Sequence, residues 1–317
     1  MTANDEYLSK SFPYNTDNVL SIEMNRLTHL IQEHTPKDGG FLLNIPGLYV
    51  GRISRPNIDN VKSFYSPSLG IVVQGSTLVS IGHEVYPNDK AHMHIIPIAI
   101  PITLRTIEAS PTTPYLSIRL DLNPQKIAAL IPKVYPTGLP GIQKRNINYS
   151  VDIDTNIVNA FSRLLQLLKN PNDVELLAPL IIDEILIRLL RSPIGKHVAE
   201  IGYLDSESQQ ITKAIFWLRE NFAQPIKIAA LAELSNMSVS AFHRHFKALT
   251  NISPLQYQKA LRLHEARHLM LSQQMDATTA CHMVGYISDS QFSRDYSIFF
   301  ENPPKRDIEK MKRMSEF

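Results

Sequence analysis

The sequence has a single cysteine, Cys281, among its 317 residues. One cysteine cannot form an intramolecular disulfide, and it leaves no cysteine pair for a zinc finger, which suits a reducing cytosol. No apolar run reaches the roughly 18 residues that a membrane-spanning helix needs. The N-terminal segment also carries acids where a signal peptide carries positive charge. We therefore expect a cytoplasmic protein with no membrane partner.

Signatures of two enzyme classes are missing as well. The sequence contains no glycine-rich phosphate loop and no nucleophile elbow, so a kinase or a hydrolase would lack its chemistry. The net charge is only +2, and residues 206–317 hold 14 basic and 11 acidic side chains. That excess is too small to indicate nucleic-acid binding by itself. The functional interpretation must therefore come from motifs.

The apolar pattern of the first two thirds predicts a β-rich domain flanked by helices. One helix is expected over residues 17–34, where apolar residues recur at a spacing near 3.6. Short apolar runs separated by turn residues fill 41–122, as in an antiparallel barrel or sandwich. Two helical patterns follow, at about 157–168 and 174–190. The second is apolar on more than one side, so the barrel or another subunit must cover it.

The length and the change of pattern indicate an α+β protein of two domains. We assign residues 1–195 to a β-rich domain, 196–208 to a linker and 209–317 to an all-α domain.

The all-α domain carries a helix-turn-helix pattern. Such a motif needs a small residue where two helices cross, a turn residue that tolerates positive φ four positions later, and an apolar anchor on the next helix. Ala232 and Asn236 satisfy the first two requirements. Ser238 can cap the next helix, which Phe242 and Phe246 anchor.

The same pattern recurs about fifty residues later. Cys281 occupies the small position and Gly285 the turn, while Ser288 can cap the second recognition helix and Gln291 can complete a capping box. The anchoring apolar face is expected to contain Phe292, Tyr296 and Phe299. Two motifs in register are much more specific than one.

A long helix is expected between the two motifs. Ser253 and Pro254 form a helix start signal for a helix that runs to about residue 272. About 19 residues at roughly 1.5 Å each span about 28 Å, which approaches the roughly 34 Å between successive major-groove faces of B-DNA.

Helical rotation predicts which side chains face DNA. The face opposite the apolar anchors presents Ser240, His243, Arg244 and Lys247 on the first recognition helix, and Ser290, Ser293, Arg294 and Ser297 on the second. Each arginine could fork onto guanine or clamp a phosphate. The alternative is that these outward faces are merely solvated.

These residues also carry a family resemblance. The segments SVSAFHRHFKALTNISPLQYQKALRLHEARHLM and VGYISDSQFSRDYSIFF make residues 211–309 resemble the DNA-binding region of AraC/XylS-type transcription regulators. The resemblance implies DNA contacts at Ser240, His243, Arg244, Asp289, Ser290, Ser293 and Arg294. Asp307 stands where the family usually has an aromatic residue, which leaves the packing of the last helix open. Asp289 is an acidic residue at a phosphate-rich surface, and it can instead favour its helix N-terminus.

The first half resembles the cupin-like N-terminal domain of one subgroup of this family, through FYSPSLGIVVQG and EASPTTPYLSIRLDL. The resemblance implies a cupin-like β-barrel that senses a small-molecule effector and dimerises through helices at about 155–191. We therefore expect a ligand-responsive transcription activator, a homodimer whose partners are double-stranded DNA and RNA polymerase. We expect no enzyme activity, no catalytic residues, no metal and no cofactor.

Three alternatives stay open from the sequence. His92 and His94 share one face of a strand, as in metal-dependent cupin enzymes, although Ile98 and Ala99 stand where a carboxylate ligand is expected. Such an enzyme could be fused to the DNA-binding unit. Cys281 could be a redox sensor rather than a small buried residue. The protein could also bind DNA constitutively, without a ligand.

Overall fold

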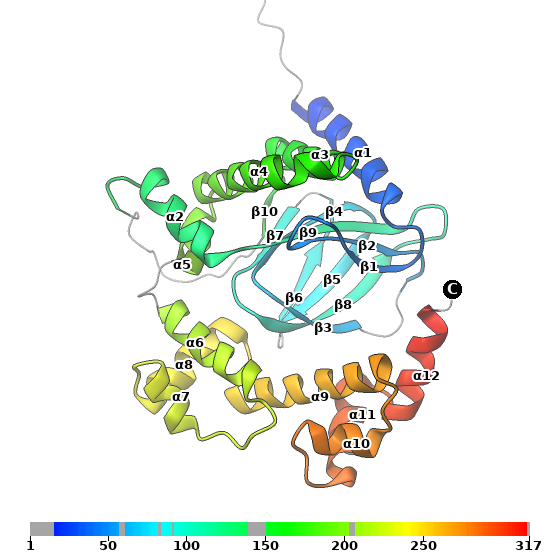
Figure 1. Cartoon of the computed structure of the whole chain (residues 1–317), viewed down its shortest axis with the longest axis vertical. Coiled ribbons are helices and arrows are strands. Elements are labelled where there is room, and N and C mark those ends of the chain that lie inside the picture. Colours follow the sequence, from blue (N-terminus) through cyan, green and yellow to red (C-terminus); the bar gives the residue numbers. More distant parts are fainter. Residues whose placement is uncertain are drawn as a thin grey trace, which may run out of the picture.

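The computed structural model describes residues 16–56, 61–81, 84–90, 92–138, 150–202 and 207–315. Two antiparallel sheets with flanking helices form the first part, and helices alone form the second (Figure 1). None of the helices in these ranges is long and apolar enough to cross a lipid bilayer. The expected α+β architecture with a helical C-terminal region is thus confirmed.

The described strands form a six-stranded and a four-stranded sheet. The first has the order β1 (Gly39–Leu42), β2 (Leu48–Ile53), β9 (Tyr115–Asp121), β4 (Ser68–Gln74), β7 (His92–Ile96) and β10 (Ser150–Asp152). The second has the order β3 (Val61–Tyr65), β8 (Ile100–Glu108), β5 (Ser76–Ile81) and β6 (Glu84–Asn88).

Alternation along β9 gives the six-stranded sheet two different faces. Leu116, Ile118 and Leu120 are at most 1% exposed and belong to a core shared with helices. Ser117 and Arg119, on the opposite face, line a cavity between the sheets.

Helices close the outer face of the six-stranded sheet (Figure 1). The shared core takes residues from α1 (Thr16–Glu33), α2 (Pro124–Val134), α3 (Thr155–Leu167), α4 (Pro171–Arg191) and α5 (Gly195–Gly202). The helices expected near 17–34, 157–168 and 174–190 are confirmed as α1, α3 and α4. Sequence analysis missed α2, although Asn123 caps it and Pro124 occupies its first turn.

The second part consists of α6 (Glu207–Glu220), α7 (Ile228–Leu234), α8 (Val239–Thr250), α9 (Pro254–Ser272), α10 (Ala277–Met283), α11 (Asp289–Phe300) and α12 (Pro304–Ser315). Residues 195–202, most of which the sequence analysis assigned to a linker, form α5. There Val198 and Ala199 are fully buried in the first core. The domain boundaries themselves remain a prediction.

The two parts share a second core, in which strands of the four-stranded sheet pack against α6, α8 and α9. Tyr257 of α9 donates a hydrogen bond to the carbonyl oxygen of Ala99 over 2.7 Å, and its ring meets Phe64 edge-on at 5.4 Å. Asn251, after α8, donates to the carbonyl oxygen of Ile81 over 3.3 Å. The first helix-turn-helix is therefore docked on the β domain.

Candidate nucleic-acid interface

The first helix-turn-helix has the local geometry that its sequence predicts. Asn236 adopts a φ of 50° in the turn between α7 and α8, and Ala232 is 1% exposed where the helices cross. Ser238 caps α8 by accepting a hydrogen bond from the backbone N–H of Ala241 over 3.3 Å. Phe246 is fully buried beneath the helix.

The second helix-turn-helix repeats this geometry. Gly285 has a φ of 85°, and a Cβ atom there would lie 2.0 Å from the carbonyl oxygen of Ala223. Cys281 is fully buried, and burial together with the nearby Asp289 carboxylate raises the pKa of its thiol to about 12. A protonated, inaccessible thiol disfavours the redox-sensor alternative. Ser288 caps α11 by accepting from the N–H of Gln291 over 3.4 Å.

The side chains expected to face DNA lie on the surface of the whole chain, so the β domain does not cover them. Most are exposed: Ser240, His243, Arg244, Lys247, Asp289, Ser290, Ser293 and Arg294. Ser297 differs, because it is half-buried and donates a hydrogen bond to the carbonyl oxygen of Ser293 over 2.7 Å. The sequence analysis omitted one anchor, Phe300, which is buried, while the expected anchor Phe299 is half-buried against the same core.

Helix α9 ties the two helix-turn-helix units together. Its Gln258 and Arg262 both donate to the carbonyl oxygen of Phe222, after α6, over 2.8 Å. Lys259 pairs with Asp295 of α11 at 3.0 Å. The spacing between α8 and α11 is thus fixed by polar contacts as well as by the apolar cores.

Asp307 explains how α12 packs without the aromatic residue of the family pattern. Its side chain is 5% exposed and pairs with Arg267 of α9 at 2.8 Å. Tyr296 of α11 donates a hydrogen bond to the same carboxylate over 2.8 Å, and the Arg267 guanidinium lies 4.3 Å from the ring centroid of Phe300. Burial and the adjacent Asp307 raise the pKa of Tyr296. The buried ion pair between Arg267 and Asp307 thus joins α9 to α12, and the hydrogen bond from Tyr296 adds α11.

A cavity of about 90 Å³ lies between the two sheets of the β domain; we call it the intersheet cavity. One wall is apolar and includes Val79, Ile102 and Leu104 of the four-stranded sheet, whereas the opposite wall carries His94 and Arg119. Burial lowers the pKa of His94 to about 4. Its Nε2 atom has no hydrogen-bond partner within the part of the chain that the structure describes.

The two strand histidines, His92 and His94 of β7, have different contacts. The ring of His92 lies 6.4 Å from that of His94, and its Nδ1 contacts Asp89 at 3.0 Å. Neither belongs to a group of three ligand atoms close enough to hold an ion, within the residues described.

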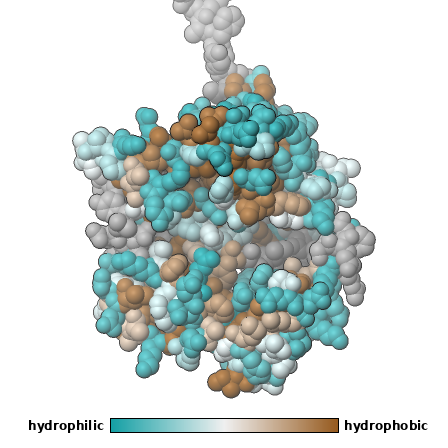
Figure 2. Space-filling view, in the orientation of Figure 1, coloured by the Kyte–Doolittle hydropathy of each residue, from teal (hydrophilic) through white to brown (hydrophobic). Residues whose placement is uncertain are grey.

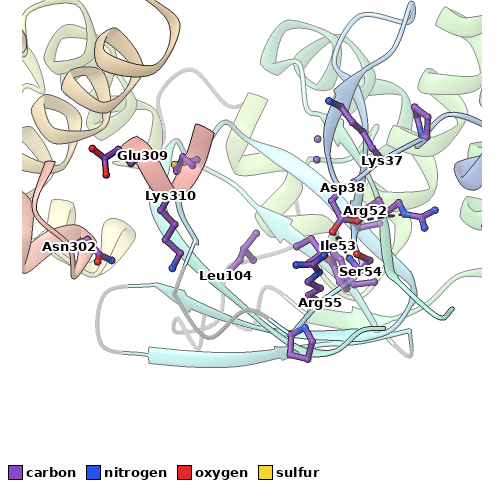
Figure 3. Close-up of a pocket in the computed structure, with 18 of the residues that line it drawn as sticks. Lys37, Asp38, Arg52, Ile53, Ser54, Arg55, Leu104, Asn302, Glu309 and Lys310 are labelled. Carbon is purple, nitrogen blue, oxygen red and sulfur yellow. Dashed lines mark hydrogen bonds and ion pairs between the residues drawn. The ribbon is translucent and has the colours of Figure 1, made fainter. Parts of the chain in front are cut away.

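A larger cleft of about 1640 Å³ lies between the β domain and α12; we call it the α12 cleft. Figure 3 shows Lys310 extending from α12 toward Leu104, with Arg55 and Lys37 coming from the opposite side. Arg52 contacts Asp38 at 3.6 Å within it. No local pattern could have predicted this cleft, because the residues on its two sides lie at least 185 positions apart in sequence, the separation of Ser117 and Asn302.

Two family matches cover most of the chain. Residues 44–197 match the AraC-type transcriptional regulator N-terminus, and residues 231–309 match a helix-turn-helix domain. Two HTH-type transcriptional activators named RhaS are similar to about a third of this chain. The protein of Escherichia coli O139:H28 is 30% identical over 105 residues, which is 33% of this chain and 37% of the relative. That of Pectobacterium carotovorum is 29% identical over 100 residues, 32% and 36% of the two chains. The matched segment thus spans little more than a third of each relative.

The solved structure of ToxT from Vibrio cholerae resembles this chain across both parts. The TM-score is 0.57 at 9% identity, and the match covers 82% of this chain and 97% of ToxT. At that identity the likeness shows the fold alone. The two family matches agree with the pair of helix-turn-helix units described above. The chain therefore belongs to the AraC/XylS-type transcription regulators.

Proposed function

We propose that this protein is a ligand-responsive transcription regulator that inserts α8 and α11 into adjacent major grooves on one face of DNA. The observation that carries the proposal is the pair of similarly built units, each with an exposed arginine on its recognition helix, Arg244 and Arg294. Arginine can read guanine bidentately or clamp a phosphate. The 19 residues of α9 span about 28 Å, which suits this docking.

The remaining contacts in this proposal follow the exposed faces of both recognition helices. Ser240, His243 and Lys247 would accompany Arg244, and Ser290 and Ser293 would accompany Arg294. Asp289 and the half-buried Ser297 are weaker candidates, since one is acidic and the other is bonded to the backbone. The name of the RhaS relatives, transcriptional activator, supports activation as the output. In this proposal the protein acts in the cytoplasm and recruits RNA polymerase.

The β domain would act as a cupin-like barrel that binds an effector and dimerises. Its intersheet cavity supports the first role. Exposed leucines on α4 support the second: Leu176 is 73% exposed and Leu180 is 64% exposed. Figure 2 shows hydrophobic side chains gathered over the helices at the top of the view. A second copy that covered α4 would remove this apolar surface from water.

Selection of bound sequences from a random duplex pool tests the proposal. The wild-type chain should enrich a site with two half-sites about one helical turn apart. The matched variants Arg244→Ala and Arg294→Ala should each relax the preference at one half-site only. A pool that stays random after repeated selection would refute sequence-specific binding.

A further inference from the structure

Three side chains with metal-ligating atoms meet in the second helix-turn-helix. Cys281 and His282 lie on α10, and Asp289 is the first residue of α11. The two helices share an apolar core (Figure 1). The Cys281 sulfur, a His282 ring nitrogen and an Asp289 carboxylate oxygen all lie within 4.8 Å of one another. Within the described ranges of the chain, no other group of three such residues is as close.

The distances suit a small divalent ion after a modest movement. Zn²⁺ binds sulfur at about 2.3 Å and nitrogen or oxygen at about 2.0–2.2 Å, so two of its tetrahedral ligands lie about 3.3–3.7 Å apart. His282 Nε2 and Asp289 Oδ1 are already 3.7 Å apart. Both side chains are 56% exposed, so their ends can move toward a bound ion.

The sulfur of Cys281 lies just beneath the surface. The residue is fully buried, yet its Sγ atom is within 4.8 Å of the ends of two exposed side chains. An ion captured by His282 and Asp289 would therefore meet the sulfur as its third ligand.

The first helix-turn-helix offers an internal comparison. The turn residues Asn236 and Gly285 are 49 positions apart. At the positions that match the three side chains, the first unit has Ala232, Glu233 and Ser240. Only the glutamate among these is an ordinary metal ligand. The helix-turn-helix geometry therefore does not itself require a cysteine, a histidine and an aspartate here, and the trio belongs to the second unit alone.

The three donor types indicate the class of metal. A thiolate and an imidazole favour zinc over the hard ions magnesium and calcium, and three protein ligands leave a fourth position for water. When the Cys281 sulfur binds the ion, its thiol proton passes to solvent. A divalent ion with one thiolate, one carboxylate and a neutral imidazole carries no net charge, whereas the metal-free thiol and carboxylate carry one negative charge.

We propose that Cys281, His282 and Asp289 form a zinc-binding site between α10 and α11. The sequence-based expectation of no metal weighed only the strand histidines His92 and His94 and zinc fingers with two cysteines. This proposal replaces that expectation for the second helix-turn-helix.

The position of the site connects it to DNA binding. Asp289 begins the second recognition helix, where its negative charge opposes the approach of phosphates. Bound zinc cancels that charge and should tighten DNA binding modestly. This consequence rests on the proposed function, whereas the metal site itself does not.

Cobalt titration of the reduced full chain, without DNA, tests the site. A cobalt–thiolate bond gives a near-ultraviolet charge-transfer absorption, which can come only from Cys281 because the sequence has no other cysteine. One equivalent of Co²⁺ per chain should produce this band. Added Zn²⁺ should remove it, because a tetrahedral site with a thiolate ligand suits zinc.

Four variants identify the ligands. Cys281→Ala should abolish the band and should fold, because Ala232 occupies the matching position of the first unit. His282→Gln and Asp289→Asn change exposed side chains, and each should weaken cobalt binding about tenfold or more. His29→Gln changes an exposed histidine on α1 and should have no effect.

Three results would overturn the site and leave only a surface ion pair above a small buried residue. These are no band at an excess of cobalt, a band that both His282→Gln and Asp289→Asn leave unchanged, or saturation at half an equivalent, which would mean that two chains share an ion.

A second measurement tests the effect on DNA binding. Zinc should tighten binding of the wild-type chain to its selected duplex about threefold, the effect of one charge roughly 6 Å from a phosphate in water. It should leave Cys281→Ala unchanged, and equal zinc effects on both proteins would overturn the connection to DNA. Because the cobalt titration uses no DNA, it can fail while duplex selection succeeds, and the reverse.

Discussion

Removing the charge of Asp307 should destabilise the second helix-turn-helix strongly. The carboxylate is 5% exposed and its partner Arg267 is 15% exposed, so Asp307→Asn leaves a guanidinium largely buried without its counter-charge. Loss of one partner of a buried ion pair costs roughly 3–5 kcal/mol. Because Arg267 keeps some contact with water, we expect the lower end, about 3 kcal/mol. Urea unfolding followed by far-ultraviolet circular dichroism measures the change.

A second variant separates the charge effect from lost packing. Arg267→Met combined with Asp307→Phe places an aromatic residue at the family's aromatic position and buries no charge. Its stability should exceed that of Asp307→Asn, because well-packed apolar residues can replace a buried ion pair, although the Tyr296 hydroxyl loses its acceptor. An Asp307→Asn protein as stable as the wild type, or a double variant less stable than Asp307→Asn, would refute the reasoning.

Three other predictions concern the turn, the contact between the two parts and the β domain. Gly285→Ala should cost at least about 2 kcal/mol, since its φ is 85° and the new Cβ would lie 2.0 Å from the Ala223 carbonyl oxygen; thermal unfolding measures this. Tyr257→Phe leaves the Ala99 carbonyl without its donor, so the free energy of unfolding should fall by about 1–2 kcal/mol, and limited proteolysis between α5 and α6 should accelerate. His94, whose folded pKa is about 4 against an ordinary 6.5, binds fewer protons folded than unfolded. The stabilisation that depends on neutral His94 is therefore present above about pH 6.5 and should be lost as the pH falls toward 4. The urea midpoint of His94→Gln should fall less than that of the wild type over this pH range.

Sequence reasoning located the elements whose signals are local. Asn236 and Gly285 were recognised as turn residues from their spacing to Ala232 and Cys281, and both adopt positive φ. The start of α9 was equally clear from Ser253, because capping depends on residues three positions apart.

Features that depend on distant contacts escaped the sequence. Asp307 could not be paired with Arg267, which lies 40 residues away. Tyr257 and Ala99, whose hydrogen bond docks the first helix-turn-helix on the β domain, are separated by 158 residues. The start signal of α2, Asn123 followed by Pro124, was local and was overlooked, because Pro132 lies inside the helix and weakens its helical pattern.

Titration of a selected duplex with single-arginine variants tests the central claim most directly. Two further duplexes carry one scrambled half-site each, and Lys133→Ala, an exposed residue on α2 of the β domain, serves as the control. Arg244→Ala should lose about 1–3 kcal/mol only where the half-site read by α8 is intact, and Arg294→Ala only where that of α11 is intact. Unchanged affinity for both variants, or losses independent of which half-site is scrambled, would contradict the account.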